Sequence, residues 1–254
     1  MTEVADRIAL SLARAWETNA RACGGTVERI DGLLVALTEV ADPQLNVAVV
    51  ERAPDDPAAA LATATEVFSD HGFRIGLDLP RARHPDVERA AADLRMIVGV
   101  SRPAMSAMVA ELTPPVPPPG VEISRLDAED DLRDMWQIQS TAFGMRPDVA
   151  RAYLSAELLR TPGVTCLIAG LDGRPVASAL AMEIDGSVGL FGVATLPDAR
   201  GRGIGTAITA AAVDRVRDRC DLAWLQASED GGRVYRRMGF STVGDWDVWL
   251  RPPG

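Results

Sequence analysis

Residues 197–206 read Pro-Asp-Ala-Arg-Gly-Arg-Gly-Ile-Gly-Thr, and they separate a strand-like stretch, 187–196, from an alanine-rich stretch typical of a helix, 203–219. A glycine-rich turn that opens a helix directs free main-chain N–H groups at one point, where the helix dipole adds positive potential. Glycines also let the main chain approach a bulky anion closely. Arg200 and Arg202 add charge that suits phosphate oxygens. The stretch therefore predicts a pyrophosphate-binding turn.

The same turn also resembles part of a dinucleotide-binding fingerprint, because Gly201 and Gly203 are followed by Asp221 about twenty residues later. The third glycine of that fingerprint would fall at Thr206, and the preceding elements look like an antiparallel meander instead of a βαβ unit. A nicotinamide-dependent enzyme stays an alternative, and so does a turn that merely connects two elements.

The second half of the chain alternates between helical and strand-like patterns. Two turn signals, Asp172-Gly173 and Asp185-Gly186, separate three strands that are expected to form a meander. The predicted helices are 126–143, 147–159, 203–219 and 231–238, and the predicted strands are 164–170, 175–184, 187–196, 222–228 and 240–251.

A second motif, Tyr-Arg-Arg-Met-Gly-Phe at 235–240, follows about thirty residues after the glycine-rich turn. Together with the Arg-x-x-Gly-x-Gly of residues 200–205, it resembles the GNAT superfamily of acyl-CoA-dependent N-acetyltransferases. The resemblance covers residues 121–250. It implies an α/β fold of the α+β type, in which a central mixed, mostly antiparallel sheet is flanked by helices.

The resemblance implies that acetyl-CoA is the acetyl donor and that coenzyme A is released as the product. The turn would bind the pyrophosphate, and the end of the preceding strand would pair with the pantetheine amides. A main-chain N–H of that strand would polarise the thioester carbonyl, as in an oxyanion hole. Ser228 stands where much of the family has an asparagine. The cofactor-binding residues so implied are Val193, Ala194, Thr195, Arg200, Gly201, Arg202, Gly203, Ile204, Gly205, Thr206 and Ser228.

Tyr235 is the catalytic residue that the resemblance implies. A phenol with a pKa of about 10 can protonate a departing thiolate whose conjugate acid has a pKa of about 8.5. The alternative is a tyrosine that packs its ring on the sheet. Glu183, on the strand before 187–196, is one candidate for the base that deprotonates the amine, and Glu229 and Asp230 are others.

The composition excludes several other classes of protein. All 26 basic residues are arginine, so a lysine Schiff base and a Walker A loop are impossible. The net charge of −10 argues against a nucleic-acid partner. Two histidines and three cysteines without a CxxC pair predict reduced thiols in the cytoplasm and no metal site. No signal peptide or membrane-spanning run is recognised.

Five prolines fall within residues 113–120, and they predict a linker between a domain at 1–112 and a catalytic domain at 121–254. The first half repeats the order of elements seen at the end of the second. Its predicted helices are 58–71 and 85–94, and its strands lie within 26–38, 46–51 and 73–79.

Two tandem GNAT-like domains are therefore expected, and the N-terminal copy is expected to be degenerate. Residues 51–58, where the first copy should carry its turn, read Glu-Arg-Ala-Pro-Asp-Asp-Pro-Ala, which adds negative charge and removes donors. No tyrosine occurs in 1–112.

The expected function is transfer of an acetyl group from acetyl-CoA to a primary amine by direct attack in a ternary complex. The acceptor would be a small-molecule amine or a peptide N-terminus, with no nucleic-acid or membrane partner. A non-enzymatic acyl-CoA sensor is the alternative. The sequence leaves open whether the protein is a monomer or a homodimer.

Overall fold

The structure is a computed structural model that describes residues 2–114 and 116–252. The chain forms two compact units: Met1–Ala104 with Thr242–Gly254, and Met105–Ser241. This division differs from the expected boundary at 113–120, because the proline-rich stretch falls within the second unit and the last strand belongs to the first.

The first unit holds an antiparallel meander followed by a parallel strand. The expected strand at 26–38 is two strands, because Asp31 and Gly32 both take positive φ, at 37° and 83°, and form a tight hairpin turn. A helix at the N-terminus was not among the expected elements. The elements are α1 (Thr2–Ala22), β1 (Thr26–Ile30), β2 (Leu33–Leu37), β3 (Asn46–Val50), α2 (Pro57–Asp70), β4 (Gly76–Pro80), α3 (Pro85–Asp93) and the first part of β5 (Ile97–Met108).

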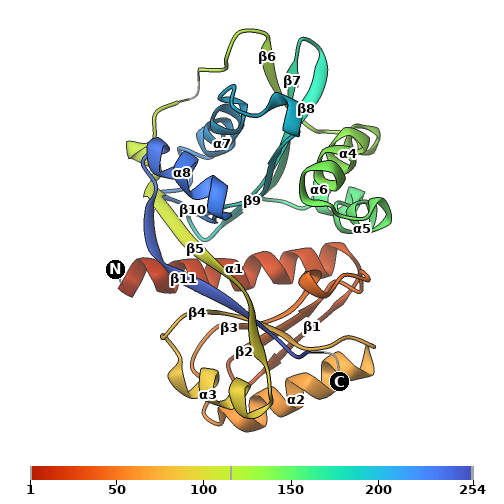
Figure 1. The fold of residues 1–254 in the computed structure, drawn as a ribbon, viewed down its shortest axis with the longest axis vertical. Helices are drawn as coiled ribbons and strands as arrows, with labels where there is room; N and C mark the ends of the chain where they lie inside the picture. The colour runs from red at the N-terminus through yellow and green to blue at the C-terminus, as the bar shows by residue number, and fades with distance from the viewer. Residues whose placement is uncertain (1, 115, 253–254) are drawn as a thin grey trace. The chain divides into compact units, whose positions relative to one another are not determined.

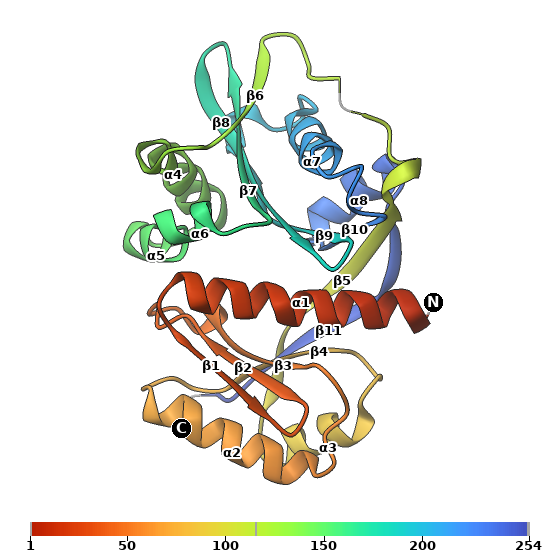
Figure 2. The ribbon, with the colours of Figure 1, turned by 180° about the vertical axis from the view of Figure 1, so that it is seen from behind.

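Helices cover both faces of this sheet. Figures 1 and 2 show α1 on one face of β1–β3 and α2 with α3 on the other. Asp56 begins α2 by accepting the Ala59 N–H at 3.0 Å, and Pro57 occupies the first helical position. The larger core lies on the α2 face around Phe68 and Leu77, both of which are fully buried.

The second unit has the sheet order β5-β10-β9-β8-β7-β6, and only β9 and β10 are shown to run parallel. The meander predicted before the glycine-rich turn is β7-β8-β9, with antiparallel registers. The expected helix at 147–159 is broken at Leu154, because Ser155 caps a new helix by accepting the Leu158 N–H. The elements are β6 (Val121–Arg125), α4 (Leu132–Phe143), α5 (Pro147–Tyr153), α6 (Ala156–Arg160), β7 (Val164–Leu171), β8 (Arg174–Ile184), β9 (Ser187–Thr195), α7 (Ile204–Asp214), β10 (Leu222–Gln226) and α8 (Glu229–Met238).

Figure 1 shows α7 and α8 on one face of this second sheet and α4–α6 on the other. The core on the α7 face includes Ile204, Ile208, Leu225 and Phe240, all almost completely buried. The expected mixed, mostly antiparallel sheet flanked by helices is confirmed. No helix among the described residues is both long and apolar enough to cross a bilayer.

The final strand, β11 (Ser241–Leu250), explains why the units differ from the expected domains. The order β1-β2-β3-α2-β4-α3-β5 is repeated as β7-β8-β9-α7-β10-α8-β11. However, β11 pairs with β4 in the first unit, with Leu250 opposite Gly76 and Trp246 opposite Pro80. The last part of β5 belongs to the second unit, where β5 neighbours β10. The second copy therefore gives its last strand, β11, to the first unit, and the end of β5 extends into the second unit.

Arg81 holds β11 in the first unit. Its Nε and Nη2 donate to the two carboxylate oxygens of Asp247 at 2.9 and 2.7 Å, and Nη1 donates to Asp245 at 2.9 Å. Nη2 also donates to the Ser101 hydroxyl on β5. Asp247 is buried, and hydrogen bonding from Arg81 lowers its pKa. Arg81 thus connects the end of β4 with both exchanged strands.

A second ion-pair network lies on α1, where Glu17 accepts from Arg29 at 2.5 Å, Arg21 at 2.9 Å and Arg14 at 3.1 Å. These contacts, with Arg29 first among them, lower the pKa of Glu17 from 4.5 to about 2. A carboxyl whose pKa is lower in the folded state stabilises the fold above its unfolded pKa, and that stability is lost as the pH falls.

We expect Glu17→Gln to reduce the free energy of unfolding by about 1–2 kcal/mol at pH 7, a modest value because solvent screens the pairs. The difference from the parent should shrink as the pH falls from about 4.5 to about 2. Urea unfolding at several pH values measures it. Asp86→Asn, which alters the exposed Asp86–Arg89 pair, is the control and should change stability little at any pH. An equal deficit for Glu17→Gln at pH 2 and pH 7 would contradict the prediction.

Candidate active site

The parallel pair β9–β10 separates part of the way along β9. Their register runs only from Ser187 opposite Leu222 to Gly189 opposite Trp224, whereas β9 continues to Thr195. The edge of β9 beyond Gly189 therefore faces an opening in the sheet. In the first unit the corresponding strands, β3 and β4, align over residues 48–49, close to the end of β3 at Val50.

A β-bulge lies in the diverging part of β9. The register with β8 shifts so that Gly192 and Val193 together lie opposite Ala179. Gly192 has a φ of 53°, which favours glycine. A bulge leaves one residue outside the ladder and re-aims its main-chain groups. The opening between β9 and β10 is therefore next to a main-chain segment that does not follow the regular sheet pattern.

The glycine-rich turn follows directly at the end of β9. Gly201 and Gly203 adopt positive φ of 76° and 78°, and Gly203 is the N-cap residue of α7. Arg200 donates from Nε to the Thr195 carbonyl at 3.1 Å, and Arg202 has no hydrogen-bond or ion-pair partner among the described residues. Both arginines are exposed. The turn thus offers a helix N-terminus and unneutralised guanidinium groups, which is the donor set a pyrophosphate needs.

Tyr235 lies on α8, after the N-cap residue Ser228. The Ser228 hydroxyl accepts the Gly231 N–H at 3.2 Å, so one of its lone pairs already caps the helix. The Tyr235 ring packs edge-on against Phe240 at 5.9 Å between centroids. Burial raises the pKa of Tyr235 to about 12, an effect that a hydrogen bond with Thr209 of α7 opposes. Tyr235 is therefore a neutral phenol at physiological pH.

The structure brings together most of the predicted site residues. Val193 on β9, Ile204 and Ile208 on α7, and Tyr235 on α8 pack in the same apolar cluster. Residues 193–195, the turn at 200–206 and Tyr235 therefore border one region of the second unit.

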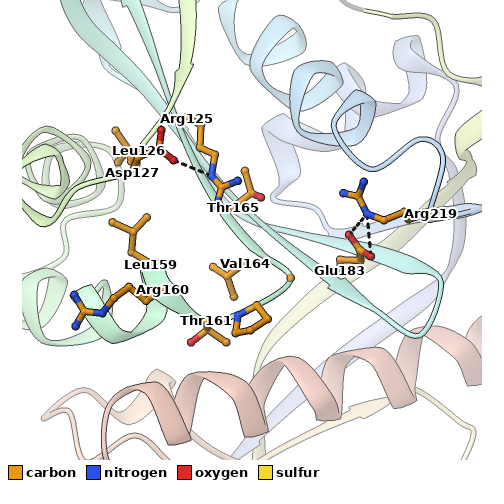
Figure 3. Close-up of a pocket in the computed structure, with 12 residues that line it drawn as sticks. Arg125, Leu126, Asp127, Leu159, Arg160, Thr161, Val164, Thr165, Glu183 and Arg219 are labelled. Atoms are coloured by element: carbon orange, nitrogen blue, oxygen red, sulfur yellow. Dashed lines mark hydrogen bonds and ion pairs between the residues drawn. The ribbon is translucent and has the colours of Figure 1, made fainter.

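Glu183 lies elsewhere. It pairs with Val188 at the start of β9, four residues before the bulge at Gly192, or roughly 13 Å along the strand. Its two carboxylate oxygens share the single Arg219 Nε–H, at 3.0 and 3.3 Å. Figure 3 shows this pair at one side of a cavity of about 680 Å³. The cavity is lined by Arg125, Leu126, Asp127, Leu159, Arg160, Thr161, Pro162, Gly163, Val164, Thr165, Glu183 and Arg219.

The other two candidate bases, Glu229 and Asp230, lie exposed in the first turn of α8, where the helix dipole favours a carboxylate. Asp230 also approaches Arg233 at 3.4 Å. Within the described ranges, no group of three or more His, Cys, Asp and Glu residues could hold a metal ion.

Gln139 lies next to the bulge in β9, and it was not among the residues predicted from the sequence. It lies on α4, is only 3% exposed, and donates from Nε2 to the Ser178 hydroxyl at 2.8 Å and to the Gly192 carbonyl at the bulge. The sequence does carry a signal for it. Gln139 falls seven residues after Leu132, on the same buried face of the helix, where an amide must find partners.

The turn of the first unit, between β3 and α2, already holds a carboxylate. Asp31 of the β1–β2 hairpin accepts the Asp56 N–H at 3.0 Å and pairs with Arg52 at 3.3 Å. Main-chain hydrogen bonds from Asp56 and Asp55 lower the pKa of Asp31. In an anion-binding turn, main-chain N–H groups face a phosphate. In this turn the Asp31 carboxylate accepts the Asp56 N–H instead.

Residues 130–240 match the family described as the acetyltransferase (GNAT) family. Among solved structures, a GCN5-related N-acetyltransferase from Kribbella flavida has a TM-score of 0.79 at 23% identity, covering 99% of this chain and 96% of its own. One from Sphaerobacter thermophilus has a TM-score of 0.61 at 16% identity, covering 98% and 94%. A tandem GNAT protein from the clavulanic acid biosynthesis pathway has a TM-score of 0.59 at 17% identity, covering 77% and 70%.

A search of curated proteins found no match. The structural likenesses, all below 25% identity, show a shared fold that includes the tandem arrangement. The sequence match spans α4 to α8, so residues 130–240 of the second unit are similar to the acetyltransferase (GNAT) family.

Proposed function

We propose that the second unit transfers an acetyl group from acetyl-CoA to a primary amine by direct attack in a ternary complex. The observation that carries the proposal is the path of β9. This strand leaves β10 after Gly189, bulges at Gly192 and ends at the glycine-rich turn that opens α7. An edge able to pair with amides thus runs directly into a site suited to a pyrophosphate.

Two segments would hold acetyl-CoA. Residues 200–206 would bind the pyrophosphate through the N-terminus of α7 and the guanidinium groups of Arg200 and Arg202. The edge of β9 at 193–195 would pair with the pantetheine amides. Ser228 caps α8 with a lone pair and keeps its O–H free to donate to a pantetheine carbonyl.

Acetyl-CoA supplies an activated thioester. The Val193 N–H would donate to the carbonyl oxygen and stabilise the negative charge that develops as the amine nitrogen bonds to the carbon. Tyr235 would donate its proton to the sulfur as the carbon–sulfur bond breaks. A phenol with a pKa of about 12 is a weak acid for a thiolate in water, but burial also raises the pKa of thiols. In this protein, burial raises the pKa of Cys166 to about 12. A thiolate that leaves away from water would likewise have a raised conjugate-acid pKa, which brings it closer to that of Tyr235.

The amine would attack in its neutral form. The mechanism gives Glu183 no direct part, because its carboxylate is bound to Arg219 and lies away from the bulge. The ammonium form would lose one proton to water before binding. After the nitrogen bonds to the carbonyl carbon, it would lose a second proton, which would pass through water to the Tyr235 phenolate. The transfer rate should therefore rise with pH through the pKa of the acceptor amine.

Binding and turnover test the proposal separately. CoA should protect the wild-type protein against heat, and acetyl-CoA with a panel of primary amines should release free thiol. Arg202→Ala should weaken CoA binding about 5- to 20-fold, because one charge-assisted contact to phosphate is lost. Arg89→Ala removes an exposed arginine of the first unit and is the matched control, with unchanged affinity. Absence of CoA binding would refute the proposal. Tight binding without thiol release on any amine would favour the acyl-CoA sensor.

A further inference from the structure

We propose that Gln139 is a positioning residue, which aims the Val193 N–H at the thioester oxygen. This inference rests on the proposed function. The side-chain amide of Gln139 is buried against the bulge, and its Nε2 uses both protons, one for the Ser178 hydroxyl and one for the Gly192 carbonyl. A carbonyl can only accept, so the contact with Gly192 fixes which end of the amide is the nitrogen.

Because the peptide bond is planar, the direction of the Gly192 carbonyl also sets the direction of the Val193 N–H. The C=O of Gly192 and the N–H of Val193 belong to one trans peptide unit, in which they point in opposite directions. Because Gln139 on α4 holds the carbonyl toward that helix, the Val193 N–H is directed away from it. The parallel register with β10 has already ended at Gly189, so β10 does not determine this orientation.

The surroundings indicate that the bulge has a single conformation. A Cβ on Gly192 would lie 2.9 Å from Gln139 Nε2 and 3.1 Å from Oε1, so the amide fits only against a glycine. The positive φ at Gly192 costs little for glycine, and the hydrogen bond from Gln139 selects this conformation from the others that glycine allows. Ser178, fully buried on β8, accepts the second amide proton, so the amide cannot rotate freely. Preorganised donors of this kind stabilise developing charge without reorganisation during the reaction.

The carbonyl stretch of acetyl-CoA labelled with ¹³C at the thioester carbon reports this N–H directly. In the wild-type complex the band should lie below its position in buffer. In Gln139→Met, which keeps the length and loses the donors, the band should return most of the way to that position. The ratio of the CoA to the acetyl-CoA dissociation constant should also fall about 3- to 10-fold. Ser178→Ala, which removes the other amide contact and leaves the Gly192 carbonyl bonded, should keep most of the shift.

A merely structural role for Gln139 predicts a different result. If Gln139→Met binds CoA normally and shows the wild-type band, the inference is overturned. Should that variant fold poorly, Gln139→Leu is a second apolar replacement that also lacks the donors, so the same comparison applies. If the wild-type protein itself does not bind CoA, the proposed function fails. If it binds acetyl-CoA with an unshifted band, only the positioning role fails.

Discussion

Tyr235→Phe will lower the turnover number for acetyl transfer by about 100-fold, while the affinity for CoA changes by less than about 3-fold. The substitution removes only the hydroxyl. The ring, which packs against Phe240 and above Gly231, stays in place. Steady-state thiol release at saturating acetyl-CoA measures the turnover number, and calorimetry measures the affinity. Tyr153→Phe, which alters the other tyrosine of the chain, is the matched control and should retain wild-type turnover.

The pH profile adds a second test of the same role. Since burial raises the pKa of Tyr235 to about 12, the phenol keeps its proton up to about pH 11. Activity should therefore rise with pH as the amine deprotonates and show no fall below about pH 11 that belongs to the acid. A descending limb near pH 9 that disappears in Tyr235→Phe would contradict the pKa and the environment described for this residue. Unchanged turnover in the variant would remove the acid role altogether.

The second large effect concerns stability. Arg81→Met should lower the midpoint of thermal unfolding by roughly 5–10 °C, because it leaves the buried carboxylate of Asp247 without its charge partner. Asp245 and Ser101 lose a hydrogen bond in the same change. Calorimetry measures the midpoint. Arg89→Met, an arginine whose pair with Asp86 is exposed, is the control and should change it by about 1 °C at most.

A double variant separates the buried charge from the general loss of contacts. Replacing both partners, as in Arg81→Met with Asp247→Leu, should recover much of the stability, since an apolar pair avoids the desolvated charge. The pKa of Asp247 is lowered by Arg81, so the wild-type protein should also lose this contribution as the pH falls below about 4. If the loss of stability in the double variant equals the sum of the losses in the two single variants, the charge pair does not stabilise the docking of β11.

Local patterns predicted much of the second unit. The turn signals at 172–173 and 185–186 separate β7, β8 and β9 as expected, and the glycine-rich turn opens α7. Such features depend on neighbours in the sequence, because hairpin turns and helix starts are decided by a few consecutive residues. The packing of Val193 and Tyr235 against one core follows from the order of these elements, whereas their roles in a site stay predictions.

Other features depend on contacts between distant residues. Nothing within Ser241–Leu250 says that its partner is β4, some 165 residues earlier along the chain, since any edge of a sheet could accept an alternating strand. The bulge at Gly192 was also not predicted, because a single glycine in a strand pattern is compatible with a regular ladder. The contact of Gln139 could not be predicted because the sequence does not show that the Gly192 carbonyl faces α4. The base stayed undecided for a similar reason, since the pairing of Glu183 with Arg219 is a tertiary contact.

The exchange of terminal strands has a consequence for how the protein is made. Synthesis proceeds from the N-terminus, yet the first unit lacks β11 until residue 250 has left the ribosome. Until then the outer edge of β4 has no β11 to cover it, although β1 to β4 were synthesised long before. The half that is translated first is therefore completed last. A pause near the end of translation should prolong exposure of that edge and make nascent chains prone to pairing with one another.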